Sequence, residues 1–292
     1  MLNNLNNKIQ KPKRVVVFGS SGFIGKNLLS ELKKKKINFI GINSTKIDLT
    51  KRNSITKVEK LVSNNDSLIF LSALTPDKGK DLKTFKKNIK MVENFLEGIK
   101  NKNPNHLIYF SSDAVYSFEN TLISEKTPLF SGDYYSLMHI TRELMIKNEV
   151  NCPSLFIRPT AVFGFGDTHN SYGPNRFLKD AISKKNVTLG GKGEETRDHI
   201  FINDLINLSI LCILYKTIGF LNAATGSSIS FMGLAKLIKK KVPEIQINTT
   251  ERNNSITYRK FNIDQLNTIF NEFSFTKIED SLSQYLKKIN KK

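Results

Sequence analysis

The chain has 292 residues, 45 Lys and Arg against 26 Asp and Glu, and a formal net charge of +19. That length is enough to bury a full core and allows one large domain or two unequal ones. Some classes of protein are excluded, because no apolar run is long enough to cross a membrane and residues 1–13 are too polar and lysine-rich for a secretory signal. We therefore expect a cytoplasmic protein without a membrane span.

The positive charge suggests nucleic-acid binding, because clustered Lys and Arg neutralise phosphates. The lysines are instead spread along the chain, and the run at residues 33–36 falls where a first helix should end and where its dipole favours cations. Aromatic and basic residues do not alternate. We expect no nucleic-acid partner.

Cysteine and histidine give no sign of a metal site or a disulfide. Cys152 and Cys212 lie among apolar neighbours, which predicts two buried thiols. The four histidines are scattered along the chain, so no metal centre is expected.

A glycine motif follows the first predicted strand. Residues 15–18 are an apolar run, residues 19–25 are Gly-Ser-Ser-Gly-Phe-Ile-Gly, and a helical pattern continues over residues 27–32. The first glycine makes the tight turn, the second lets backbone approach a pyrophosphate, and the third lets the helix pack on the strand. The helix N-terminus adds unpaired N–H groups for phosphates. The spacing predicts a dinucleotide site formed by Gly19, Ser21, Gly22, Phe23, Ile24 and Gly25.

The rest of the chain alternates strands and helices. Strands are predicted at residues 38–42, 67–71, 106–110 and 154–157, with helices over residues 81–99 and 133–147. This alternation predicts an α/β protein with a Rossmann-type, doubly wound parallel sheet. After Arg158 the pattern loosens into loops, short elements and a terminal helix over residues 282–289. We expect a polar N-terminal extension (1–13), a dinucleotide-binding core (14–165) and a smaller, mainly substrate-binding lobe (166–292), with residues 194–215 returning to the core.

The end of the second strand bears on the choice of cofactor. An NAD-specific site usually places an Asp or Glu there, against the ribose hydroxyls. This chain has Asn43, Ser44, Thr45 and Lys46 instead. The hydroxyls and the amine can contact a 2′-phosphate, which favours NADP slightly over NAD, although a short polar turn explains the segment equally simply.

Several further motifs follow in a fixed order. Ser111, Ser112 and Asp113 come directly after the strand at 106–110, and Tyr135 and His139 lie one helical turn apart. With the glycine motif, residues 47–49, residues 157–164 and residues 196–204, they resemble the extended short-chain dehydrogenases/reductases. That family comprises NAD(P)-dependent epimerases, dehydratases and ketoreductases that act on nucleotide sugars. The resemblance covers nearly the whole chain.

The resemblance implies roles for particular residues. Tyr135 is implied as the general acid/base, Ser112 as a hydrogen-bonding partner of the same substrate oxygen, and Arg197 as a planar clamp on the substrate diphosphate. It also implies a homodimer formed through the helices that carry Met91 and Tyr135. The other positions implied are, for the cofactor, Asp48, Leu49, Leu71, Ser72, Ala73, Tyr135, His139 and Arg158, and, for the substrate, Thr75, Asn175 and Arg176.

One position departs from the family pattern. The family has Tyr-x-x-x-Lys, and its ammonium group helps to lower the pKa of the tyrosine from about 10. This chain has His139, which with an ordinary pKa of about 6.5 is mostly neutral at pH 7. We expect the pH profile of turnover to carry the titration of His139. Loss of the lysine also leaves open an alternative, a dinucleotide-binding regulatory protein without turnover, although such a protein needs neither Ser112 nor Tyr135.

A second departure narrows the reaction. Dehydratases of this family usually have Thr-Asp-Glu where this chain has Ser112, Asp113 and Ala114, and their glutamate removes a proton next to the ketone. Ala114 has no such group. The sequence therefore favours ketone reduction or epimerisation of a nucleotide sugar, with Asp113 matching the Thr-Asp pair of 4-ketoreductases or simply capping its loop.

Overall fold

A seven-stranded sheet forms the centre of the molecule, in the order β1-β11-β7-β5-β4-β2-β3. The computed structural model describes residues 2–167, 173–252 and 255–289. Neighbouring strands run parallel, except that β1 is antiparallel to β11. This confirms the predicted doubly wound sheet. The strands are β1 (Asn3–Asn4), β2 (Arg14–Phe18), β3 (Phe39–Ile42), β4 (Asp66–Phe70), β5 (His106–Phe110), β7 (Ser154–Pro159) and β11 (Thr217–Ala223).

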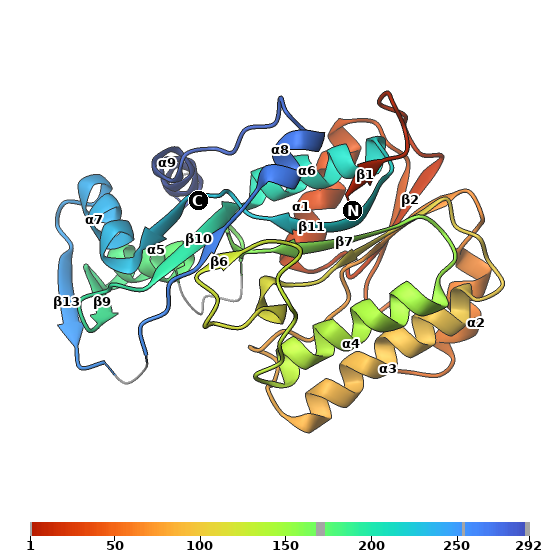
Figure 1. Ribbon diagram of the computed structural model, residues 1–292, viewed down its shortest axis with the longest axis horizontal. Helices are drawn as coiled ribbons and strands as arrows, with labels where there is room; N and C mark the ends of the chain where they lie inside the picture. The colour runs from red at the N-terminus through yellow and green to blue at the C-terminus, as the bar shows by residue number, and fades with distance from the viewer. Residues whose placement is uncertain (1, 168–172, 253–254, 290–292) are drawn as a thin grey trace.

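Helices cover both faces of this sheet (Figure 1). On one face, α1 (Phe23–Lys34) and α6 (Ile202–Leu214) pack their apolar residues on the strands. On the other face lie α2 (Ser54–Leu61), α3 (Leu82–Ile99) and α4 (Tyr134–Glu149). Strands β2, β4 and β5 are almost completely buried, as expected for parallel strands covered on both sides.

The predicted core strands, and the helices predicted at residues 81–99 and 133–147, end within two residues of the observed elements, whereas the first helix begins four residues before the predicted 27–32 and α2 was not predicted. The short strand β1 was not anticipated, and it lies within residues 1–13, the segment expected to be a polar extension. Asn3 and Asn4 pair with Ile218 and Thr217, and the Thr217 hydroxyl donates to the Asn4 side chain at 2.6 Å. Two asparagines carry no hydrophobic alternation, so this strand leaves no pattern in the sequence.

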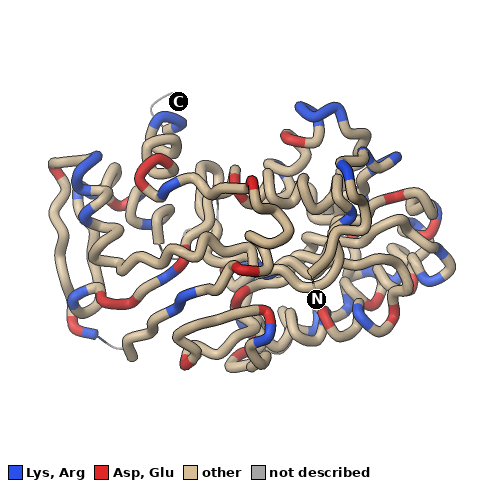
Figure 2. The backbone as a smooth tube through the Cα atoms, turned by 45° about the horizontal axis from the view of Figure 1, so that its top comes forward, with Lys and Arg blue, Asp and Glu red and all other residues tan. Residues whose placement is uncertain are grey.

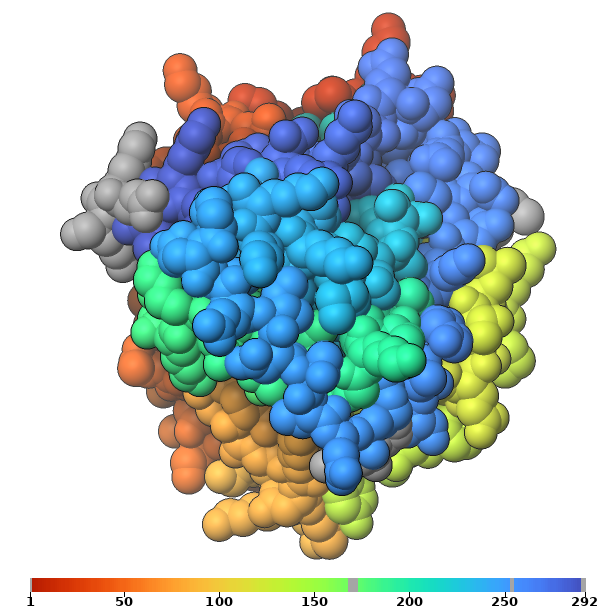
Figure 3. Space-filling view, turned by 90° about the vertical axis from the view of Figure 1, so that its left-hand side faces the viewer, coloured from red at the N-terminus to blue at the C-terminus, as the bar shows by residue number. Residues whose placement is uncertain are grey.

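Most of the remaining elements gather in a lobe at one end of the molecule, whereas α8 (Asp264–Ile269) lies over the core beside α6 and β1 (Figure 1). Figure 3 looks onto this lobe, where green segments from α5 and β9 lie beside blue segments from α7 and β13. Small sheets join β12-β10-β8, β13-β9 and β14-β6. The elements are η1 (Asp113–Val115), β6 (Leu122–Ile123), β8 (Ala161–Phe163), α5 (Gly173–Lys184), β9 (Asn186–Gly190), β10 (Thr196–Phe201), β12 (Ser228–Ser230), α7 (Phe231–Lys241), β13 (Gln246–Thr250), β14 (Lys260–Phe261), α8 (Asp264–Ile269) and α9 (Ile278–Ile289).

The positions of the charged residues and of the two cysteines can be compared with the sequence-based expectations. Figure 2 shows Lys and Arg distributed over both parts of the molecule, with Asp and Glu between them. Cys152 and Cys212 are buried free thiols, which confirms that prediction. Within the described ranges, no helix has the length and apolar character needed to span a membrane.

Candidate active site

The glycine loop between β2 and α1 has the geometry of a phosphate-binding turn. Gly19 has a φ of +88°, and a Cβ there would lie 2.8 Å from the backbone of Leu71 and Ser72. A Cβ on Gly25 would lie 2.4 Å from the carbonyl oxygen of Gly19. Both positions therefore require glycine.

The first turn of α1 is suited to an anion. Its N-cap residue, Gly22, makes no side-chain cap hydrogen bond, and no acidic residue lies in the first turn. The leading N–H groups and the helix dipole are thus available to a ligand phosphate. The loop fits the pyrophosphate of a dinucleotide.

The fold brings the turn after β3, which holds predicted cofactor residues, next to this loop. The N–H groups of Gly19 and Ser20 donate to the carbonyl oxygen of Ile42, the last residue of β3. Residues 43–46 follow there as an exposed turn in which the Asn43 side chain accepts from the Thr45 hydroxyl at 2.7 Å. Asp48 lies farther along, where its carboxylate accepts from the N–H and hydroxyl of Thr50, and this lowers its pKa. Leu49 beside it is buried.

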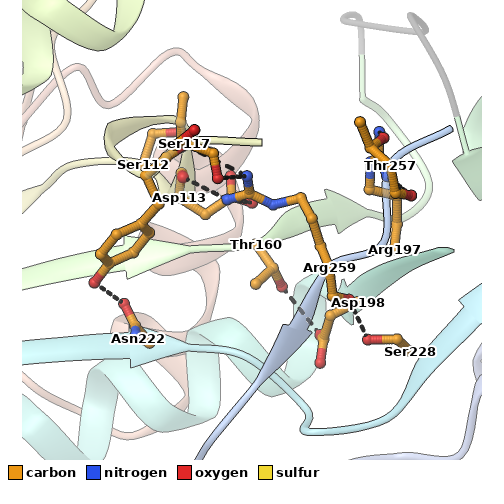
Figure 4. Close-up of polar contacts among 12 residues, drawn as sticks. Ser112, Asp113, Ser117, Thr160, Arg197, Asp198, Asn222, Ser228, Thr257 and Arg259 are labelled. Atoms are coloured by element: carbon orange, nitrogen blue, oxygen red, sulfur yellow. Dashed lines mark hydrogen bonds and ion pairs between the residues drawn. The ribbon is translucent and has the colours of Figure 1, made fainter. Parts of the chain in front are cut away.

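The loop after β5 carries Ser112 and Asp113. The Ser112 hydroxyl oxygen accepts from the N–H of Ala114 and caps the short helix η1. Asp113 forms an ion pair with Arg259 at 3.4 Å, and the Arg259 guanidinium also donates to the Asp113 carbonyl oxygen at 2.8 Å. Burial raises the pKa of Asp113, while the charges of Arg259 and Arg197 oppose this rise. Figure 4 shows the Arg259 side chain, from the position just before β14, reaching this loop.

Helix α4, which carries Tyr135 and His139, packs against η1 of the same loop. A capping box at Asp133 and Ser136 fixes the start of the helix, with Asp133 accepting from the Ser136 N–H at 2.8 Å. Tyr135 is half-buried, and its ring meets the His139 ring edge-on, with centroids 4.8 Å apart. The predicted pair is therefore in contact.

His139 is held from the sheet side by Tyr109 of β5. Its Nδ1 lies 2.7 Å from the Tyr109 hydroxyl, whereas its buried Nε2 has no hydrogen-bond partner among the described residues. Burial, with a smaller contribution from the Arg142 charge, lowers the pKa of His139 to about 3. This corrects the expectation of a histidine that titrates near pH 6.5, because the ring is only 3% exposed.

Arg158, implied as a cofactor ligand, has its guanidinium committed inside the protein. It donates to both carboxylate oxygens of Glu143, at 2.9 and 2.5 Å, and to the Tyr116 hydroxyl at 2.7 Å. The guanidinium also stacks on Phe220, 4.7 Å from the ring centroid. Burial lowers the pKa of Arg158, but hydrogen bonds and charge from Glu143 and Tyr116 outweigh it and raise the pKa.

Arg197 and Arg259 form a second cluster, at the junction with the lobe. Arg197 donates to the carbonyl oxygens of Thr196 and Thr257 and to the Thr257 hydroxyl. Phe118 lies against both guanidinium groups, 5.4 Å from Arg197 and 4.7 Å from Arg259. Arg259 is 1% exposed, and its Nε has no partner in the described part of the chain. Arg197 was predicted from the sequence, but Arg259 was not, because it belongs to no motif that includes Arg197.

The other implied substrate residues are more dispersed. The Thr75 hydroxyl donates to Asp77 at 2.5 Å in the loop after β4. Asn175 is buried, where it accepts from the Gly164 N–H at 3.0 Å and donates to Asp167. Arg176 is half-exposed and forms an ion pair with Asp180. Part of the loop at residues 166–177 lies outside the described residues.

No group of three or more His, Cys, Asp or Glu in the described ranges is arranged to hold a metal ion. The site is therefore built from a glycine loop, a hydroxyl-bearing loop, a Tyr–His helix and buried arginines.

Comparison with known proteins agrees with this geometry. The profile of the NAD dependent epimerase/dehydratase family matches residues 15–218. The chain is 29% identical to GDP-6-deoxy-D-talose 4-dehydrogenase of Aggregatibacter actinomycetemcomitans, over 94% of this chain and 97% of that one. It is 22% identical to GDP-L-colitose synthase of Yersinia pseudotuberculosis, over 90% and 92%. The solved structure of MoeE5 with UDP-glucose and NAD superposes with a TM-score of 0.82 at 16% identity, over 95% and 99%. The chain belongs to the NAD dependent epimerase/dehydratase family.

Proposed function

We propose that this chain is a ketoreductase that transfers hydride between NAD(P) and the sugar ring of a nucleoside-diphosphate hexose. The observation that carries the proposal is the loop after β5, which presents Ser112 beside the Tyr135 helix and has Ala114 where a dehydratase needs a carboxylate. The full-length match to a 4-dehydrogenase of a GDP-deoxyhexose supports carbon 4 as the reacting carbon. Reduction to an alcohol and its reverse use the same groups.

The protein groups handle the proton. In reduction, Tyr135 donates its phenolic proton to the carbonyl oxygen as that oxygen gains negative charge, and Ser112 donates a hydrogen bond to the same atom. In the reverse direction, Tyr135 as tyrosinate accepts the hydroxyl proton. Bound NAD(P) supplies the hydride donor or acceptor. Asp113, paired with Arg259, fixes the loop that carries Ser112.

The two parts of the molecule have separate roles in this proposal. Residues 14–165 hold the dinucleotide at the glycine loop, and residues 166–292, with part of 194–215 returning to the core, hold the nucleotide sugar. Arg197 contacts the substrate diphosphate, and Thr75, Asn175 and Arg176 line the sugar side. The homodimer implied by the family resemblance would cover Leu137 and Leu144 of α4, which are 36% and 60% exposed. Sedimentation of the purified protein tests whether it forms this dimer. We also propose that the enzyme acts in the cytoplasm.

NADP is proposed to bind at least as well as NAD. The turn at residues 43–46 contains no carboxylate, and the Lys46 amine is close enough to donate to the Gly41 carbonyl oxygen at 3.1 Å, beside the expected ribose position. Titration of the protein with NADPH and NADH measures the preference. A large preference for NADH would contradict this assignment.

Substitution of Tyr135 tests the reaction itself. With a 4-keto nucleotide sugar and NADPH, Tyr135→Phe is expected to abolish turnover and to leave NADPH affinity near wild type, because only the proton-transferring hydroxyl is removed. Tyr134→Phe is the matched control, since Tyr134 is exposed and adjacent on the same helix. Full activity of Tyr135→Phe would show that Tyr135 is not the acid/base. Return of substrate with inverted carbon 4, and no net use of NADPH, would identify an epimerase instead.

A further inference from the structure

The short segment at residues 257–259 contacts two parts of the candidate site at once. At one end, Thr257 accepts from the Arg197 guanidinium through its carbonyl oxygen at 3.1 Å and through its hydroxyl at 2.7 Å. At the other end, the Arg259 guanidinium reaches the loop after β5, residues 111–118, which we call the Ser112 loop. Figure 4 shows Thr257 beside Arg197, and the Arg259 side chain extending toward this loop.

Arg259 holds the Ser112 loop at three backbone positions. Its guanidinium donates to the carbonyl oxygens of Asp113 at 2.8 Å, Ser117 at 3.3 Å and Tyr116 at 3.4 Å. It also forms the ion pair with the Asp113 carboxylate at 3.4 Å. Ser112 is the N-cap of the short helix η1, which begins at Asp113. Loss of these contacts would therefore release the backbone directly after Ser112.

The backbone of Arg259 is anchored on the side of the lobe. Its N–H donates to the Thr196 hydroxyl at 3.2 Å, and its carbonyl oxygen accepts from the Ser228 hydroxyl at 2.6 Å. Thr196 begins β10 and directly precedes Arg197, and Ser228 begins β12 of the same small sheet. The Arg259 residue is 1% exposed. A buried side chain that is anchored at both ends has little room to move, so the position of β10 constrains the position of the Ser112 loop.

Phe118, at the end of the Ser112 loop, contacts both guanidinium groups. Its ring centroid lies 5.4 Å from Arg197 and 4.7 Å from Arg259. Arg197 is therefore in contact with the loop through Phe118 and with the 257–259 segment through Thr257. A ligand that binds Arg197 binds a group that already touches the Ser112 loop.

We propose that the 257–259 segment couples substrate binding to the position of the Ser112 loop, with Arg259 as the positioning residue that holds Ser112 at the reacting oxygen. Thr257 supports Arg197 at the other end of the segment, where the substrate diphosphate binds. The coupling rests on the proposed function, because it requires Ser112 to donate to the substrate oxygen and Arg197 to bind the diphosphate. Arg259 itself touches no reacting atom.

The two ends of the segment should have separate kinetic effects. Arg259→Lys keeps a positive charge but loses the planar fork that reaches several carbonyl oxygens. With a 4-keto nucleotide sugar and NADPH, we expect it to lower kcat about tenfold and to leave KM nearly unchanged, because Ser112 is displaced and not removed, whereas complete loss of such a donor costs roughly 10²–10³-fold. Thr257→Val should instead raise KM roughly two- to tenfold, as for the loss of one hydrogen bond, with little change in kcat. An unchanged kcat in Arg259→Lys, or an equal loss of kcat in both variants, would overturn the proposal.

Arg14→Lys is the matched control for loss of a guanidinium fork. Arg14 donates to both carboxylate oxygens of Asp66, at 2.7 and 2.5 Å, and the two residues begin β2 and β4 at the opposite end of these strands from the glycine loop. We expect Arg14→Lys to leave both kcat and KM unchanged. If it lowers kcat as much as Arg259→Lys does, the effect of Arg259 is a general loss of stability and the proposal is wrong.

A double-mutant cycle tests whether Arg259 acts through Ser112. If it does, Arg259→Lys should have little further effect on kcat in the Ser112→Ala protein, because the group that it positions has already been removed. Losses of kcat that multiply independently would overturn the positioning role, even if each single variant is impaired.

Hydrogen exchange tests the contact between Arg259 and the Ser112 loop without substrate or turnover. In Arg259→Lys, the amides of residues 114–118 should exchange faster than in the wild type, whereas those of β2 and α1 should not change. An unchanged exchange rate in the Ser112 loop would overturn the proposal. Full turnover in Tyr135→Phe would refute the proposed function and leave the exchange result standing. An inactive Tyr135→Phe, combined with independent losses in the cycle, would refute the role of Arg259 alone.

Discussion

Arg158 allows two assignments to be distinguished by one substitution. The family resemblance makes it a cofactor contact, whereas the structure engages its guanidinium with Glu143 and Tyr116 at about 3–4% side-chain exposure. Arg158→Met would leave the Glu143 carboxylate buried without a counter-charge. Removing one partner of a buried ion pair typically destabilises a protein by roughly 3–5 kcal/mol, so we expect a loss of that size in the free energy of unfolding.

The matched variants separate lost charge from lost packing. Glu143→Leu should lower the free energy of unfolding by a similar amount, because it leaves the Arg158 guanidinium buried without a counter-charge. The double variant should be more stable than either single variant, since neither charge is then left unpaired. Urea unfolding measures all three free energies, and titration with NADPH is carried out on the folded variants at low temperature.

The cofactor affinity of the same variant distinguishes the two assignments. NADPH affinity of folded Arg158→Met should remain near wild type, because its polar contacts seen in the structure are all within the protein. Wild-type stability together with markedly weaker NADPH binding would refute the structural assignment and restore Arg158 as a cofactor ligand.

Two other predictions concern the substrate and acid stability. Arg197→Ala should weaken nucleotide-sugar binding by roughly 1.5–3 kcal/mol, the typical contribution of a charged hydrogen-bond partner, and should hardly change NADPH affinity; equal losses for both ligands would mean that Arg197 only supports the fold. Burial lowers the pKa values of His106, His139 and His199 to about 4, 3 and 3. As the pH falls below about 6.5, these histidines bind protons in the unfolded chain but not in the folded protein, so the free energy of unfolding decreases. At pH 5 each histidine should lower the free energy of unfolding by about 2 kcal/mol. Asp198 partly offsets this loss, because its pKa is raised to about 6 and its contribution to stability changes with pH in the opposite direction. His106→Gln should flatten the fall of Tm between pH 7 and 5, and an unchanged slope would contradict this account.

The fold was predictable because parallel, doubly covered strands leave a strong pattern. Residues 106–110 are five buried residues in a row, and both the predicted and the observed strand cover them. The glycine loop was predictable for a different reason, since Gly19 and Gly25 are required by backbone contacts that only glycine allows. Strand β1, by contrast, depends on pairing with residues more than 200 positions away and has no local signal.

Sequence position located the motifs of the candidate site but not the partners of their side chains. Ser112 and Tyr135 were placed after a strand and on a helix from local patterns, and their roles came from the family resemblance. The partner of Arg158 cannot be predicted from the neighbouring sequence. A guanidinium can bind a cofactor phosphate or a carboxylate equally well, and only the folded structure shows that Glu143 lies beside it. Tyr109 was missed because its contact with His139 arises only where the sheet and the helix meet.

The distribution of positive charge shows why composition gave little information about chemistry. Most of the 45 Lys and Arg residues are exposed, where water and salt screen their charges. The cations that bear on the site are buried, and a buried charge acts over a distance that a surface charge does not, because little water lies between it and its target. Arg259 and Arg158 are paired with neighbouring carboxylates, whereas the Arg142 guanidinium donates to the carbonyl oxygens of Ser72 and Asn88. The net charge of the whole chain therefore says little about a site whose electrostatics depend on a few buried side chains.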